Sequence, residues 1–183
     1  GVYARVDDEP VAFVVPKTLL ETLDHDPLHY RNKEFLGQMT TAWARRLELL
    51  TATSKVEVLK DKGRFWSVGT LQTYADARKV EPILRALDDL RAARFLEPDA
   101  APAAASDLQK PVRTVRLSIV PDEGREDRAA SLVELQIGGP CAGHEGELYA
   151  RSGAKGTPVC IQAEDAKPFE ASDADGRLAR PFA

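Results

Sequence analysis

Apolar and polar residues alternate in three short stretches between residues 47 and 68, and this is the period of a β-strand with one buried face. The apolar positions of the alternation are Leu47, Leu49, Val56, Val58, Trp66 and Val68. A turn at Asp61-Lys62-Gly63 separates the second stretch from the third, and glycine readily takes the positive φ that tight turns need. The pattern therefore predicts three antiparallel strands.

A helical period replaces the alternation after residue 76. Its apolar stripe consists of Val80, Ile83, Leu84, Leu87 and Leu90. Asp76 is the predicted N-cap, because its carboxylate can accept backbone N–H bonds. Pro82 lies past the first turn and removes one helical hydrogen bond, so we predict either a bend between Arg78 and Pro82 or a helix start closer to Glu81. The apolar face of the strands needs a cover, and we predict that Trp66 is buried under this helix.

Further strands are predicted on both sides of this unit, at residues 2–5, 10–15, 112–119, 132–137, 148–151 and 158–163. A short helical run at 18–23 follows the first pair. The Ala/Pro-rich stretch 97–105 has no apolar stripe and is interpreted as a surface crossing. Gly138-Gly139-Pro140 is interpreted as the stop of a strand. The predicted fold class is α+β, a mainly antiparallel β-sheet with one long helix packed on a face, plus short helices.

The beginning and the end of the chain resemble each other. Tyr3-Ala4-Arg5, a turn and Pro10-Val11-Ala12-Phe13 are echoed by Tyr149-Ala150-Arg151, a turn and Pro158-Val159-Cys160-Ile161. We interpret residues 1–24 as the last hairpin and short helix of a preceding repeat, and residues 25–183 as one nearly complete α+β repeat module. Since the chain also lacks an initiator Met, we expect it to be a fragment of a longer protein whose N-terminal part, with any membrane anchor, is missing.

Composition narrows the classes of partner. The net charge of −4 disfavours bulk binding to nucleic acids or anionic membranes, and no apolar run approaches the roughly 20 residues of a membrane span. Basic residues at 45–46 and 60–64 lie near Phe65 and Trp66, a combination typical of single-strand nucleic-acid binding. Glu48 and Glu57 on the same strands argue against that function, so no nucleic-acid partner is expected.

The candidates for catalysis or metal binding are weak in this sequence. His25 and His29 are four residues apart, but Pro27 disfavours the helix that would bring them to one ion. His144 and Glu145 are typical of an acid/base pair, yet no nucleophile motif accompanies them, and a surface loop is the simpler interpretation. We therefore predict no catalytic, cofactor-binding or metal site, and a protein that is not an enzyme. The two cysteines, Cys141 and Cys160, are either buried free thiols or a disulfide.

Several short motifs, in order, resemble the family called domain of unknown function 4340. They are Arg31-Asn32-Lys33-Glu34-Phe35-Leu36, Trp66, Asp76 with the 80–90 helix, Asp107-Leu108-Gln109-Lys110-Pro111, Leu135-Gln136-Ile137-Gly138-Gly139, Leu148-Tyr149-Ala150-Arg151 and Pro158-Val159-Cys160-Ile161. The chain departs from the family pattern at Asp107, where glycine usually follows an aromatic residue. The resemblance implies an N-terminal membrane anchor, extracytoplasmic repeat modules and an association with gliding-type ABC transport systems. It implies no catalytic residues.

The predicted function is a non-catalytic interaction or scaffold module of a membrane-associated, ABC-transport-linked assembly, with protein partners and a periplasmic location. The alternatives are a small-molecule or glycan binding module with its site between repeats, and a degenerate or unrecognised hydrolase. The implied oxidising compartment favours a disulfide between Cys141 and Cys160. Their positions agree with it, because Cys141 follows the strand expected to end at Gly138 and Cys160 lies inside the last strand of the same sheet region.

Overall fold

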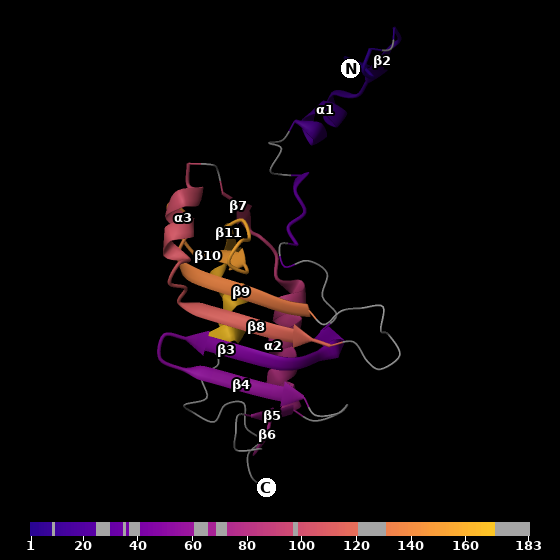
Figure 1. Ribbon diagram of the computed structural model, residues 1–183. Helices are drawn as coiled ribbons and strands as arrows, with labels where there is room; N and C mark the ends of the chain where they lie inside the picture. The colour runs from indigo at the N-terminus through magenta and orange to yellow at the C-terminus, as the bar shows by residue number, and fades with distance from the viewer. Residues whose placement is uncertain are drawn as a thin grey trace. The chain divides into compact units, whose positions relative to one another are not determined.

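The computed structural model describes residues 1–8, 10–24, 30–34, 36, 41–60, 66–68, 73–96, 99–120 and 131–170, with the backbone alone at 66–68 and 73–74. These residues belong to two compact units, Gly1–Asn32 and Lys33–Ala183, which are described separately. Figure 1 shows the elements and their labels.

The first unit consists of a hairpin and a short helix. Strands β1 (Val2–Arg5) and β2 (Ala12–Val15) pair antiparallel, and α1 (Lys17–Leu23) follows. The hairpin and the helix confirm the elements predicted at this end of the chain. None of the residues described in this unit is buried.

The described part of the second unit contains a nine-stranded antiparallel sheet in the order β6-β5-β4-β3-β8-β9-β10-β11-β7. Its strands are β3 (Ala44–Thr51), β4 (Lys55–Lys60), β5 (Trp66–Val68), β6 (Thr73–Tyr74), β7 (Arg94–Phe95), β8 (Arg113–Ile119), β9 (Ser131–Pro140), β10 (Glu147–Ser152) and β11 (Val159–Gln162). The remaining elements are η2 (Thr41–Trp43), α2 (Ala77–Asp89), α3 (Ala101–Asp107), α4 (Ala163–Ala166) and η3 (Lys167–Glu170). The predicted α+β class is confirmed.

The main core lies on one face of this sheet. Leu47 pairs with Leu117 and Leu49 with Val115 across β3 and β8, and all four side chains are buried because alternate residues of each strand point to the same face. Helix α2 covers this face with Val80, Ile83, Leu84 and Leu87, and Figure 1 shows it behind the central strands. Phe169 of η3, which is 2% exposed, completes the core.

Helix α2 begins where its cap predicts. The Asp76 carboxylate accepts a hydrogen bond from the Arg78 backbone N–H at 3.1 Å, and the Asp76 carbonyl accepts from Val80 N–H at 3.2 Å. Of the two predicted alternatives, the later start near Glu81 is therefore wrong, and the bend between Arg78 and Pro82 stays a prediction; Pro82 lies inside the helix. Pro82 is exposed, so water can replace the hydrogen bond that its missing N–H would have made. The side chain of Trp66 lies outside the described residues, and its predicted burial stays a prediction.

Two sequence interpretations were wrong. The stretch 97–105 is not a simple crossing, because its second half begins α3. Ala104 and Leu108, four residues apart, are both buried and give this Ala-rich segment a narrow apolar contact. Two buried positions are too few to appear as an apolar stripe in the sequence. Gly138-Gly139-Pro140 does not stop β9 either, since the strand continues to Pro140. Among the described residues, no helix is both long enough and apolar enough to cross a membrane.

Candidate functional site

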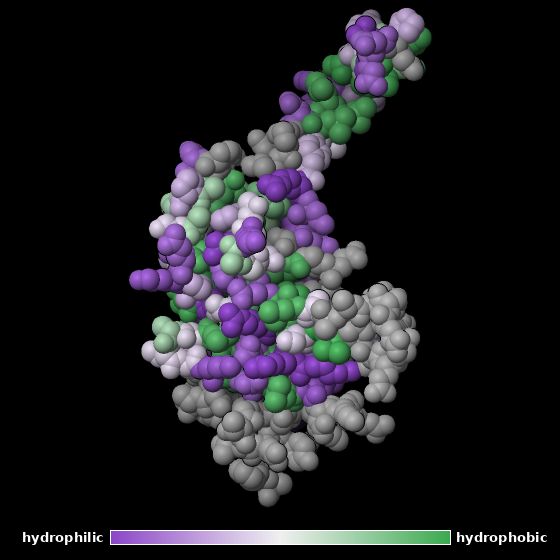
Figure 2. All heavy atoms as spheres, in the orientation of Figure 1, coloured by the Kyte–Doolittle hydropathy of each residue, from purple (hydrophilic) through white to green (hydrophobic). Residues whose placement is uncertain are grey.

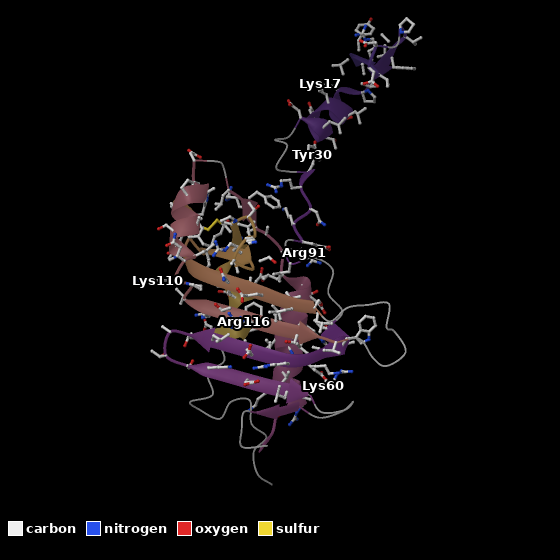
Figure 3. All side chains as sticks on the ribbon, in the orientation of Figure 1. Lys17, Tyr30, Lys60, Arg91, Lys110 and Arg116 are labelled. Atoms are coloured by element: carbon white, nitrogen blue, oxygen red, sulfur yellow. A yellow bond between two sulfur atoms is a disulfide. The ribbon has the colours of Figure 1, made fainter. Side chains whose placement is uncertain are left out.

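The sheet face opposite α2 carries an array of charged side chains, here called the polar face. It is defined by Arg46, Glu48, Lys55, Glu57, Arg116, Glu134, Gln136 and Arg151. These residues alternate with core residues along β3, β4, β8, β9 and β10, which places them together on the other side of the sheet. Figure 2 shows hydrophilic residues in purple across this side, and Figure 3 labels Arg116 within it.

On β3 and β4, two carboxylates share two cations. Glu48 and Glu57 are directly opposite each other in the register, where like charges would repel. Lys55 Nζ lies 2.7 Å from Glu48 Oε1, and Arg46 Nε lies 2.7 Å from Glu57 Oε1. Arg46 Nη2 also lies 3.1 Å from Glu48 Oε1. The hydrogen bond from Lys55, helped by the charge of Arg46 and opposed by partial burial, lowers the pKa of Glu48 below its ordinary value.

On β8, β9 and β10, a chain of hydrogen bonds continues the array. Arg116 Nε lies 2.7 Å from Glu134 Oε2, and Gln136 Nε2 donates to Glu134 Oε1 at 2.7 Å. Arg151 Nη2 donates to Gln136 Oε1 at 2.6 Å and to the Leu108 carbonyl at 2.9 Å. The hydrogen bond to Glu134 raises the pKa of Arg116.

The register joins the two halves of the polar face. Glu48 on β3 lies directly opposite Arg116 on β8, and Arg116 lies directly opposite Glu134 on β9. The shifted pKa values of Glu48 and Arg116 both favour the charged form, so these groups hold fixed charges at neutral pH. Fixed, oriented charges on an open sheet are suited to binding a complementary surface, whereas general acid/base catalysis needs a pKa near the working pH.

The disulfide lies at one end of the same sheet. Cys141 directly follows β9 and Cys160 lies in β11; their Cα atoms are 6.3 Å apart and their sulfur atoms are bonded (Figure 3, yellow). The bond belongs to a small second core with Ala104, Leu108 and Tyr149, here called the disulfide cluster. Among the described residues there is no free cysteine, so of the two interpretations the structure has the disulfide.

The loop between Cys141 and Glu147 is closed by its own backbone. Cys141 N–H donates to the Glu147 carbonyl at 2.9 Å, and the Tyr149 hydroxyl accepts from Ala142 N–H at 3.0 Å. Gly143 and Gly146 have φ of 76° and 78°, which explains the glycine content of this loop. His144 and Glu145 lie in this turn, where Glu145 is exposed, as the surface-loop interpretation predicts.

One group of possible metal ligands consists of the two cysteines of the disulfide and Glu147. Ligand atoms of Cys141, Glu147 and Cys160 lie within 4.8 Å of one another. With the two sulfurs bonded to each other, neither is the thiolate that a metal binds. The Glu147 carboxylate instead approaches Arg94, whose Nε is 3.5 Å from Oε2. The predicted metal candidates His25 and His29 lie outside the described residues.

A contact between α3 and β9 was missed by sequence reasoning. Asp107 Oδ2 accepts a hydrogen bond from Gly139 N–H at 2.7 Å. A Cβ at Gly138 would collide with the Asp107 carboxylate and come within 3.2 Å of Leu108 Cδ2. Gly138 therefore lets the end of α3 approach the strand, and the same approach brings the Leu108 carbonyl to Arg151. The signal in the sequence was a glycine pair inside an apolar strand run.

A shallow depression is found between α2 and α4. It has a volume of about 250 Å³ and is lined by Ala86, Asp89, Leu90, Glu164, Asp165 and Pro168. One of its three carboxylates, that of Glu164, is paired with Lys167 Nζ at 2.6 Å.

The fold and these contacts define an α+β module that presents a charged, ion-paired sheet face. The chain belongs to the family described as Domain of unknown function (DUF4340), whose sequence model matches residues 1–111. The match includes the first unit and the second unit up to the residues before β8, whereas the motifs at 135–161 lie beyond it. No curated protein and no solved structure matches the chain.

Proposed function

We propose that this chain is a non-catalytic interaction module that works on the extracytoplasmic side of a membrane, in an assembly linked to ABC transport. The observation that carries the proposal is the polar face, because it is a preorganised array of four cations and three carboxylates on an open sheet. The family membership supports it through the resemblance described above, which implies an anchored, transport-linked protein.

Preorganisation is the reason that the polar face is suited to a protein partner. Each charged group is held by neighbours on adjacent strands, so a partner that matches the pattern does not have to order flexible side chains. Arg46 and Lys55 remain 44% and 50% exposed at their side chains and can reach acidic groups of a partner. Such complementary charges give orientation and fast association.

The disulfide supports the extracytoplasmic location. Disulfides persist in oxidising compartments such as the bacterial periplasm and are rare in the cytosol. Mass spectrometry of the unreduced, alkylated protein from its natural compartment tests this part. We expect both cysteines to be blocked, and two freely alkylated thiols would contradict the location.

A matched pair of double variants tests the binding surface. Arg46→Gln with Lys55→Gln removes two cations from the polar face, and Lys79→Gln with Arg85→Gln removes two exposed cations from α2, on the other side of the sheet. Membrane-impermeant crosslinking in the natural cell, followed by identification of the linked proteins, measures partner capture. We expect the first pair to lose transport-system components at least about tenfold while the control pair retains them, and equal capture by both pairs would refute the assignment.

A further inference from the structure

The first unit carries an apolar surface that its described residues do not cover. In the described part of residues 1–32 no side chain is buried, although many are large and apolar. In the hairpin and the helix, the exposed apolar side chains include Tyr3 at 84%, Val14 at 69%, Leu23 at 58%, Val11 at 52%, Leu20 at 50% and Phe13 at 48%. An isolated two-stranded hairpin is at best marginally stable in water, so this surface needs a partner.

The second unit contains the same segment in its covered state. Hairpin β10–β11 followed by α4 repeats the order β1–β2–α1, with the shared residues Tyr-Ala-Arg in the first strand and Pro-Val before or at the start of the second. Tyr149 corresponds to Tyr3 and is 6% exposed, and Ile161 corresponds to Phe13 and is 0% exposed. The same kind of hairpin is therefore covered by residues of its own unit in the second unit, whereas the described residues of the first unit leave theirs uncovered.

The strand register supports the correspondence. Tyr3 pairs with Val14, whose aligned residue in the second hairpin is Gln162. Tyr149, the counterpart of Tyr3, pairs instead with Cys160, two positions before Gln162. A shift of two residues leaves every side chain on the same face, whereas a shift of one would reverse the faces. The face of β1–β2 that carries Ala4 and Phe13 thus corresponds to the core face of β10–β11.

The elements that cover hairpin β10–β11 indicate which elements of a partner would cover hairpin β1–β2. Strand β9 pairs with β10, strand β7 pairs with β11, and the inner face of the hairpin packs into the core under α2 and η3. A sheet that already holds its own β10–β11 hairpin has no vacant place at this position. The occupant must therefore present an unpaired β9-like strand and an apolar core face.

We propose that the hairpin β1–β2 with α1 completes the sheet of a second module of this same α+β fold, one that lacks its own β10–β11 hairpin. Strand β1 adds to the β9-like strand of that module, and Phe13 enters its core where Ile161 lies in this one. This surface is separate from the polar face, so the inference does not depend on the function proposed above.

Photo-crosslinking in the natural cell tests the occupant. A benzophenone side chain is placed at Phe13 and, as the matched control in the same unit, at the exposed turn residue Asp8. We expect Phe13 to link to a peptide from a DUF4340-type module other than residues 33–183, at its β9-like strand or its α2-like helix, and Asp8 to link there at least tenfold less. Linkage to residues 33–183 of this chain or of a second copy, linkage to a protein of another fold, or no linkage would each overturn the proposal.

Hydrogen exchange on the purified chain 1–183 provides a second measurement. Without the occupant, we expect the amides of β1 and β2 to exchange at least about a hundredfold faster than those of β10 and β11. Phe13→Asp should leave the melting temperature of the chain unchanged, whereas Ile161→Asp should lower it strongly. Equal protection of both hairpins, or protection of β1–β2 that rises with protein concentration, would show that the chain itself or a second copy covers the hairpin and would overturn the inference.

Discussion

A single methyl group at Gly138 tests the contact between α3 and β9. In Gly138→Ala the new Cβ would occupy the place of the Asp107 carboxylate and press on Leu108, which is 1% exposed. Either the Asp107–Gly139 hydrogen bond is lost or the end of α3 moves away from the strand. Overpacking of this kind costs about 1–3 kcal/mol in the free energy of unfolding.

The next residue, Gly139, provides a matched control. A Cβ at Gly139 would find its nearest atom, Asp107 Oδ1, at 3.4 Å, so Gly139→Ala should be tolerated within about 0.5 kcal/mol. Asp107→Ala removes the hydrogen bond at an exposed position and should cost about 1 kcal/mol. It also removes the carboxylate that Gly138→Ala would strike, so the double variant should cost little more than Asp107→Ala alone.

Urea unfolding at 25 °C, with the midpoint converted at constant m-value, measures all four variants. The expected coupling between Gly138→Ala and Asp107→Ala is at least about 1 kcal/mol, which a double-mutant cycle resolves. Additive costs in the cycle, or a Gly138→Ala variant as stable as Gly139→Ala, would refute the close approach of α3 to β9.

Three further predictions concern covalent, acidic and metal chemistry. Reduction of Cys141–Cys160, which are 19 positions apart, should lower the free energy of unfolding by about 3 kcal/mol, and an unchanged melting temperature in fully reduced protein would contradict this. The pKa of Glu48 is lowered in the folded protein, so its contribution is present above its ordinary value of 4.5 and is lost as the pH falls through the folded pKa. Glu48→Gln should therefore flatten the acid limb of a stability–pH curve, and an unaltered limb would exclude the ion pairs as its cause. Zinc or nickel should leave the melting temperature unchanged, and a saturable rise abolished by His25→Ala would establish a site at His25 and His29.

The strands were predictable where one face of the sheet is buried. Leu47 and Leu49 alternate with Glu48 because one face meets α2 and the other is the polar face, and the sequence shows that difference directly. The two-residue strands β6 and β7 are too short to show any alternation. Helix α3 was not predicted because its burial depends on Ala104 and Leu108 alone.

The polar face was only partly predictable. Glu48 and Glu57 were expected on strands, but their relation to Arg116 depends on the pairing of β3 with β8, which no local pattern specifies. The disulfide could be predicted because β9 and β11 both pair with β10, so the two cysteines lie on strands that are close in sequence. The contact of Asp107 with Gly139 joins residues that share no hairpin, and the glycines alone did not reveal it.

The central position of β3 affects how the sheet can form. Its neighbours are β4, which follows at once, and β8, which is reached only after α2 and α3 have been made, as the pairing of Leu49 with Val115 shows. Such a non-local contact raises the contact order and slows folding, because the intervening chain must be closed into a loop first. During vectorial synthesis the β3–β4 hairpin must therefore wait with an open edge for seconds until residues 113–119 emerge. Strands β9 and β10 each pair with the next strand in the chain, so the disulfide between the end of β9 and β11 links strands that assemble locally. The edge of β3 is instead the segment most in need of protection from association with other chains.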